Sequence, residues 1–321
     1  MSVAGLDDSR HKSGAAGKIL GQIPAWLWFG AGLFLLFVIG GNRALQDADT
    51  YWQIVVGQWI IDHRAFPTVD IYSFTKTGAP WISSSWLAQV LYAASYRAFG
   101  WGGPVMLAGL ATAAAFALLA QILGKRFAPI HAVIVAMAAT VLSAYHFIAR
   151  PHLLALPVMV LWVYGLVRAS DERRAPSLVL LPLIVLWTNL HGGFVFGLAL
   201  IAPFALDAVW NADASQRVSL ALRWALFGVC AVAASCITPY GWDSLLAARR
   251  ILDLRNAMAY IPEWQPVDFS SLGPFEVCVL AAPGLVLWRG VVLSPPRILL
   301  VLGLLHMALS HTRNIEIFAL L

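Results

Sequence analysis

Residues 31–40 read AGLFLLFVIG, a continuous run without a charged or hydrogen-bonding side chain. Similar apolar stretches of about 17–25 residues recur along the chain, and each is long enough for an α-helix to cross the hydrocarbon core of a bilayer. Because lipid offers no hydrogen bonds to the backbone, a spanning segment is either a helix or part of a closed barrel. Continuous rather than alternating apolar runs favour helices. We therefore expect an all-α fold, a polytopic transmembrane helical bundle.

Composition leads to the same class. Of 321 residues, 60% are hydrophobic and 12% are charged, and the mean hydropathy is +0.76. Soluble domains usually carry about 25% charged residues. The net charge of +5 is of the kind that cytoplasmic Lys and Arg give membrane proteins. Since the sequence contains no nucleic-acid-binding motif, we expect a lipid bilayer and no nucleic acid among its partners.

The hydropathy pattern predicts nine to ten spans. The first, at 22–41, follows a basic leader at 1–21 and is interpreted as a retained signal anchor. Further spans are predicted at 103–124, 130–148, 152–168, 177–191, 193–210, 220–237, 273–289 and 294–311, and a tenth begins near Ile315. With a cytoplasmic N-terminus, twelve of the 21 Lys and Arg residues lie on the inner side, as the positive-inside rule requires.

This topology leaves two long outer loops, at about 42–102 and 238–272. The first contains two short aromatic-rich segments, Tyr51–Ile61 and Ser85–Tyr92, which are too short to span. Trp and Tyr favour the headgroup level, so we expect two helices lying in the membrane interface.

The pair Asp47 and Asp49 follows the first span at its outer end. Two carboxylates at this spacing can share a divalent cation such as Mg²⁺ or Mn²⁺, or one can act as a general base while the other positions it. The alternative interpretation is that one of them caps the helix that follows.

Cationic residues lie at predicted outer span ends. Arg150 and His152 flank Pro151 and suit a phosphate or pyrophosphate, although Arg150 can instead extend its charge to the interface. His191 lies beside two glycines and can bind an anion or transfer a proton. Capping of exposed carbonyls by Asn189 and His191 is the alternative.

Two further candidates lie near the C-terminal spans. His306, Ser310 and Arg313 follow i, i+4, i+7 and are expected to share one helix face, and ionisable groups at membrane depth are functional candidates. Trp264 can stack on a sugar ring or anchor its loop at the interface. In the predicted topology all these candidates face the same outer side.

The order of several short motifs carries a family resemblance. The chain contains Asp47-x-Asp49-Thr50-Tyr51-Trp52, Gly57-x-x-Ile60, Pro67-x-x-Asp70-x-x-Ser73-Phe74-Thr75, Gly78-x-Pro80-Trp81, Trp86-Leu87, Arg150-Pro151-His152, Asn189-x-His191-Gly192, Thr238-Pro239-Tyr240-Gly241 and Arg313-Asn314. This series resembles bacterial membrane glycosyltransferases of the GT-C superfamily, to which protein mannosyltransferases and the oligosaccharyltransferase catalytic subunit are more distantly related. The resemblance covers most of residues 22–321.

The resemblance implies an inverting transfer of sugar from a polyprenyl-phosphate donor to a glycan, lipid or protein acceptor of the cell envelope. It implies a bacterial inner-membrane protein whose site faces the periplasm. Asp49, and second Asp47, would be the base or metal ligand. The donor phosphate would be held by Arg150, His152, His191 and Arg313, and the substrate by Asp70, Asn189 and Trp264.

The chain departs from the family in two places. The residues before Trp86-Leu87 are Ser83-Ser84-Ser85, where the family often has His or an acid. The sequence stops at Leu321 within a predicted span, so we expect it to be truncated before the family's later helices. A transporter or flippase of a lipid-linked substrate and a non-catalytic, degenerate relative are the alternative hypotheses.

Overall fold

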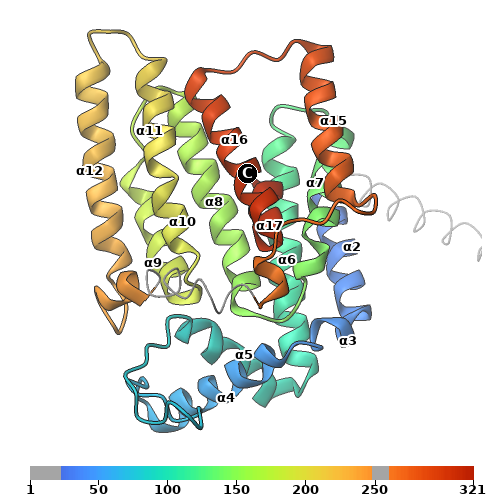
Figure 1. The fold of residues 1–321 in the computed structure, drawn as a ribbon, viewed down its shortest axis with the longest axis vertical. Helices are drawn as coiled ribbons and strands as arrows, with labels where there is room; N and C mark the ends of the chain where they lie inside the picture. Colours follow the sequence, from blue (N-terminus) through green and yellow to red (C-terminus); the bar gives the residue numbers. More distant parts are fainter. Residues whose placement is uncertain (1–22, 248–259) are drawn as a thin grey trace, which may run out of the picture.

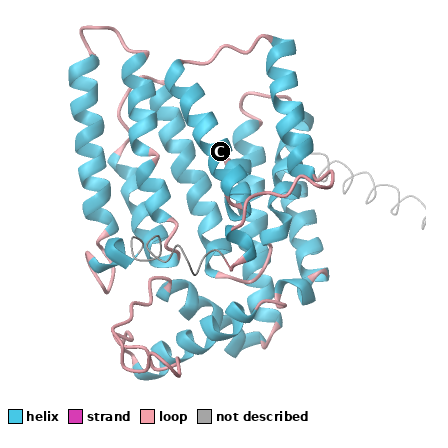
Figure 2. Ribbon diagram, viewed as in Figure 1, coloured by secondary structure: helices cyan, strands magenta, loops and turns pink. Residues whose placement is uncertain are grey.

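The computed structural model describes residues 23–247 and 260–321. In these residues the chain forms helices, loops and one isolated β-bridge between Val69 and Pro80, with no strand (Figures 1 and 2). The all-α prediction is therefore confirmed for the described part of the chain. The predicted leader, the first residue of the first span and the middle of the second outer loop lie outside the described residues.

The helices follow one another in the order α2 (Ala25–Ile39), α3 (Gly41–Ala44), α4 (Ala48–His63), α5 (Trp86–Phe99), α6 (Gly102–Leu123), α7 (Pro129–Ser143), η2 (Ala144–His146), α8 (Pro151–Asp171), η3 (Leu178–Leu180), α9 (Leu181–Leu190), α10 (Phe194–Ala199), α11 (Ile201–Trp210), α12 (Arg217–Ser235), η4 (Pro262–Trp264), α15 (Pro274–Arg289), α16 (Pro295–Ser310), η5 (Thr312–Asn314) and α17 (Ile315–Leu320).

Four described helical segments are long and apolar enough to cross a membrane. They are Gly102–Leu123, Pro129–His146, Pro151–Asp171 and Arg217–Ser235. The apolar helical segments Ala25–Ile39, Leu178–Leu190, Phe194–Trp210 and Pro295–Ser310 are shorter, with 10–17 residues each. A polytopic bundle is thus plausible, and the predicted count of nine to ten spans remains a prediction.

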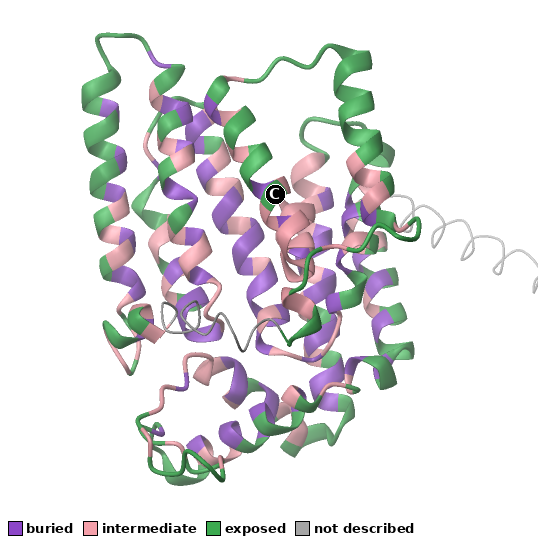
Figure 3. Cartoon of the chain, viewed as in Figure 1, coloured by how far each residue is buried: buried purple, intermediate pink, exposed green. Residues whose placement is uncertain are grey.

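The surface of α12 supports a lipid environment. Val218, Leu222, Leu226 and Val229 are 62–72% exposed and follow one another at helical spacing along one side of the helix. Figure 3 shows this outer side of α12 as largely exposed. A continuous exposed apolar stripe is unfavourable in water and suits contact with lipid or another protein.

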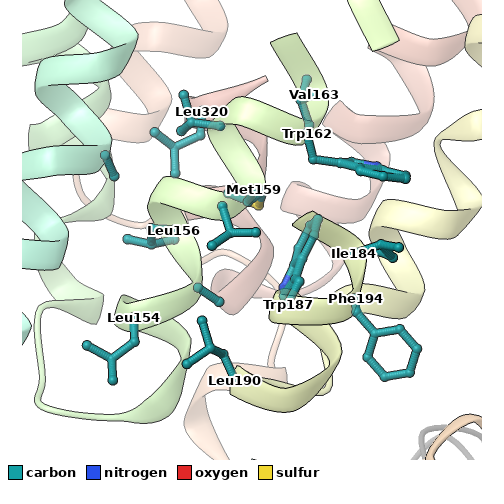
Figure 4. Close-up of a cluster of buried hydrophobic side chains, with 14 of the residues drawn as sticks. Leu154, Leu156, Met159, Trp162, Val163, Ile184, Trp187, Leu190, Phe194 and Leu320 are labelled. Atoms are coloured by element: carbon teal, nitrogen blue, oxygen red, sulfur yellow. The ribbon is translucent and has the colours of Figure 1, made fainter. Parts of the chain in front are cut away.

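The core of the bundle is built around α8. Trp162 on this helix is fully buried, as are Phe116 on α6 and Phe194 on α10, and the Trp162 indole N–H donates to the carbonyl of Gly197 at 2.9 Å. Figure 4 shows Trp162, Trp187 and Phe194 in one buried cluster. Because a buried indole needs a hydrogen-bond acceptor, this contact fixes the position of α8 against α10.

A subdomain of two helices lies beneath one end of the bundle (Figure 1). α4 and α5 correspond to the two short helices predicted for the first outer loop, whereas their location in the membrane interface remains a prediction. They cross closely at Gly57, where an added Cβ would lie 2.0 Å from the carbonyl oxygen of Gln89. The Gln89 amide in turn donates to Gln53 Oε1 at 2.7 Å. This packing holds the start of α4, with Asp47 and Asp49, close to the bundle.

The opposite end of the bundle is tied together by charge. Asp207 on α11 is 2% exposed and accepts hydrogen bonds from Ser170 Oγ (2.6 Å), Arg297 Nε (2.7 Å) and Ser294. Arg297 also pairs with Asp171. These contacts connect α8, α11 and α16, so this cluster is satisfied within the chain.

Two predictions on the spans need correction. The segment predicted as one span at 193–210 is interrupted at Leu200, which separates α10 from α11. The expected helix face of His306, Ser310 and Arg313 is wrong, because α16 ends at Ser310 and His311 is extended, with φ −148°. Arg313 instead lies in the separate turn η5, so its direction is set by that turn.

Candidate functional site

Arg150 is the centre of the candidate site. It precedes the first turn of α8, where Pro151 starts the helix, and its carbonyl accepts a hydrogen bond from the buried Tyr92 hydroxyl at 3.0 Å. The preceding amide, of Ala149, donates to the carbonyl of Ala44 at 2.8 Å. The backbone of Arg150 is therefore fixed to α5 and to the end of α3.

The guanidinium of Arg150 contacts three carboxylates. Nη2 donates to Asp47 and lies 3.2 Å from Asp49 Oδ2, while Nη1 donates to Glu263 Oε1 at 2.6 Å. Burial disfavours the charge, but hydrogen bonds and charges from Asp47 and Glu263 outweigh it and raise the pKa of Arg150. Arg150 therefore stays charged and joins the α3–α4 connection to the second long loop.

The two aspartates have different roles. Asp47 is the N-cap of α4, because its Oδ1 accepts the Asp49 amide at 2.7 Å, so the capping interpretation is confirmed for Asp47. The Asp49 side chain is 48% exposed, and its Oδ1 accepts the Trp52 indole N–H at 3.0 Å. Asp49 is therefore the more accessible carboxylate.

The predicted use of Asp47 and Asp49 as metal ligands meets a competing partner, since Arg150 already lies against both carboxylates. Within residues 23–247 and 260–321, no group of three or more His, Cys, Asp or Glu side chains is arranged to hold a metal ion. The arrangement fits a carboxylate pair neutralised by the guanidinium of Arg150 better than a carboxylate pair neutralised by a metal ion.

The histidines lie next to this ion cluster. His152 Nε2–H donates to the carbonyl of His146 at 3.0 Å, and the rings of His152 and His191 are 6.2 Å apart. The backbone N–H of Gly193 donates to His191 Nδ1 at 3.1 Å. A ring nitrogen that accepts carries no proton, so His191 presents an Nε2–H donor.

Arg313 lies over the aromatic face of Trp264, with its guanidinium carbon 4.6 Å from the ring centroid. The loop around Trp264 is held by η5, because the Trp264 carbonyl accepts His311 Nδ1–H at 2.7 Å and the Thr312 amide donates to Gln265 at 3.1 Å. Burial, together with the charge of Arg150, lowers the pKa of Arg313, while Glu263 opposes this effect.

Arg150 and Arg313 thus differ in how far carboxylates neutralise their charges. Arg150 contacts three carboxylates, whereas Arg313 forms no ion pair with any described residue. A half-buried guanidinium without a carboxylate partner retains most of its capacity to bind an anion. Of the predicted phosphate ligands, Arg313 is therefore the one best prepared for that role.

Asn189 and Asp70 do not join the ion cluster. Asn189 Oδ1 accepts the Trp86 indole N–H at 2.6 Å, and its Nδ2 donates to the carbonyls of Val185 and Ile237. Asp70 Oδ1 accepts the amides of Tyr72 and Ser73, both at 2.9 Å. Each side chain stabilises its own part of the structure. The oxygen and nitrogen atoms that were predicted to contact substrate are therefore already hydrogen-bonded within the chain.

Three residues of the cluster escaped the sequence prediction. Glu263 is an ion-pair partner of Arg150, Glu316 Oε2 lies 3.9 Å from His152 Nε2, and His146 lies directly beside His152. Glu316 and His146 are ionisable residues inside or at the edge of apolar runs, and this signal could have identified both.

An apolar groove of about 750 Å³ lies beside Asn189. It is formed by α9, the end of α12 and the start of α5, and its lining includes Trp86, Val185, Leu186 and Ile237. Since His191 follows Asn189 by two residues, the groove and the histidines are adjacent along the chain.

Comparison of the chain with known protein families, with curated proteins and with solved structures finds no match.

Proposed function

We propose that this chain transfers a sugar from a polyprenyl-phosphate donor to an acceptor at the membrane surface. The observation that carries the proposal is the convergence of Arg150, His152, His191 and Arg313 with the carboxylates of Asp47 and Asp49 at one end of an apolar helical bundle. Amphiphilic anions are the ligand class that such a combination of cations and apolar surface fits.

Different residues bind different parts of the donor. Arg313 and the Nε2–H of His191 receive the phosphate, because neither has a carboxylate partner among the described residues. The groove along α9 takes the isoprenoid chain, since it is lined almost entirely by apolar side chains. The sugar then lies between the phosphate and the carboxylates.

Asp49 is the proposed base. Its carboxylate takes the proton of an acceptor hydroxyl while the acceptor oxygen bonds to the anomeric carbon of the sugar. The bond between that carbon and the phosphate oxygen breaks, and Arg313 binds the phosphate of the polyprenyl phosphate that is released. Attack from the face opposite to the phosphate inverts the configuration at the anomeric carbon.

Location follows from the same proposal. The site end of the bundle faces the periplasm of a bacterial inner membrane, where envelope glycans, lipids or proteins are the acceptors. The support is the count of Lys and Arg in the predicted topology, which assigns twelve of 21 to the inner side.

The experiment replaces Asp49 with Asn in proteoliposomes and measures transfer from the polyprenyl-phosphate sugar that mass spectrometry identifies in the copurified lipid. We expect a loss of about 10²–10⁴-fold, typical of removing a general base. Asp62→Asn is the matched control, because it removes an exposed carboxylate from the far end of the same helix. Unchanged transfer by Asp49→Asn would contradict the assigned role, and lipid movement without a covalent product would favour a transporter.

A further inference from the structure

Buried polar atoms without a hydrogen-bond partner gather at the candidate site. In the described residues such atoms occur on six side chains, and three of these belong to one neighbourhood. They are Arg150 Nε, both ring nitrogens of His146, and Glu316 Oε1. Native proteins seldom leave buried polar groups unpaired, so these atoms call for a hydrogen-bond partner that the described residues do not supply.

His152 connects these groups. It donates to the carbonyl of His146 at 3.0 Å, and its Nε2 lies 3.9 Å from Glu316 Oε2. Glu316 and His146 are 6% and 8% exposed, and α17, which carries Glu316, packs against α7. Glu316 and His146, each with an unpaired buried polar atom, are therefore both neighbours of His152.

The chemistry of this surface differs from that of the arginines. The buried carboxyl group of Glu316 offers oxygen atoms for hydrogen bonds and no positive charge for a phosphate, whereas the imidazole of His146 offers two ring nitrogens. A hydroxyl group is both a donor and an acceptor, so a neutral ligand with several hydroxyl groups fits both side chains. The phosphate of the same ligand belongs with Arg313, whose charge lies near Glu316.

We infer that Glu316 and His146 bind hydroxyl groups of the sugar carried by the lipid phosphate, and that they select the glycosylated over the bare lipid. The inference rests on the proposed function and adds to it the group that contacts the sugar. His152 is a positioning residue, because it contacts both neighbours and orients the surface between them.

The test uses the full chain, purified in nanodiscs from the cells that express it. Mass spectrometry of the bound lipid gives the ratio of glycosylated polyprenyl phosphate to bare polyprenyl phosphate. Loss of one hydrogen bond corresponds to a change in affinity of up to about tenfold. We therefore expect Glu316→Gln to lower the ratio about tenfold, and His146→Leu to lower it in the same direction.

Glu276→Gln is the matched control. Glu276 also has an unpartnered buried oxygen, but it lies in the first turn of α15. We expect it to leave the ratio unchanged, and should Glu316→Gln not fold, His146→Leu alone decides the result. A wild-type ratio in the folded variants overturns the inference and leaves the proposed function standing. Wild-type protein without any bound polyprenyl phosphate overturns both.

Discussion

Arg150 Nη2 lies 3.2 Å from Asp49 Oδ2, so the cation predicted to hold phosphate is a counter-ion of the carboxylate predicted to act as base. The same nitrogen donates to Asp47, and Glu263 takes the other side of the guanidinium. Asp49 is the most exposed of the three carboxylates, at 48% against 19% for Asp47 and Glu263. We therefore expect an anion that approaches Arg150 to displace Asp49 before Asp47 or Glu263.

The stability of this cluster depends on its single central cation. Arg150→Gln leaves Asp47, Asp49 and Glu263 facing one another, and breaking a buried ion pair by removing one partner costs about 3–5 kcal/mol. We expect the lower end of that range because the groups are partly exposed. Thermal unfolding in detergent measures the loss. Adding Asp47→Asn to Arg150→Gln should recover part of it, and a double variant that is less stable than Arg150→Gln alone would contradict this account.

For Arg313 we expect replacement to have a small effect on stability and a large effect on donor binding. It has a cation–π contact with Trp264 and no ion pair among the described residues, so Arg313→Gln should cost only about 1 kcal/mol in stability. Donor binding should fall strongly, because the phosphate loses a charge-assisted hydrogen bond worth about 1.5–3 kcal/mol. A binding titration with polyprenyl phosphate measures this, and Arg313→Lys should be intermediate. Equal donor affinity in Arg313→Gln and wild type would exclude the phosphate role.

The sequence predicted what depends on local pattern. Apolar runs placed α6, α8 and α12 within a few residues, and the aromatic segments at Tyr51–Ile61 and Ser85–Tyr92 predicted α4 and α5. The break at Leu200 escaped prediction because the surrounding residues remain apolar on both sides. Hydropathy reports whether a segment avoids water and says little about a single turn inside it.

The candidate site depends on contacts between distant segments. The proximity of Arg150 to Asp47 and Glu263 joins residues more than one hundred positions apart, and no local pattern encodes it. Sequence reasoning therefore assigned the acids and the cations to separate roles, whereas the fold pairs them. Asn189 was predicted to contact a ligand. Its side chain is instead hydrogen-bonded to the Trp86 indole and to two backbone carbonyls.

Gly57 gives a test of the α4–α5 crossing. A Cβ at this position would lie 2.0 Å from the Gln89 carbonyl oxygen and 2.8 Å from Ala93 Cβ, and the nearer atom belongs to a backbone that cannot rotate away. Gly57→Ala should therefore separate the helices and destabilise the protein by about 1–3 kcal/mol. Gly32→Ala is the control, because nothing lies within 4 Å of its Cβ position. Thermal unfolding compares the two, and equal midpoints would show that α4 and α5 do not cross here.

Asp70 distinguishes a loop role from a substrate role. Hydrogen bonds from Ser73 and Tyr72 hold the pKa of Asp70 below its ordinary value. The ionised carboxylate therefore stabilises the loop above the unfolded pKa of about 3.9, and this contribution is lost as the pH falls through the lower folded-state pKa. Hydrogen exchange at the Tyr72 and Ser73 amides, corrected for intrinsic rates, should accelerate over that window, and Asp70→Asn should weaken their protection at pH 7. Donor binding should change little, because this carboxylate is used within its own turn. Intact amide protection with lost donor binding in Asp70→Asn would instead make Asp70 a substrate ligand.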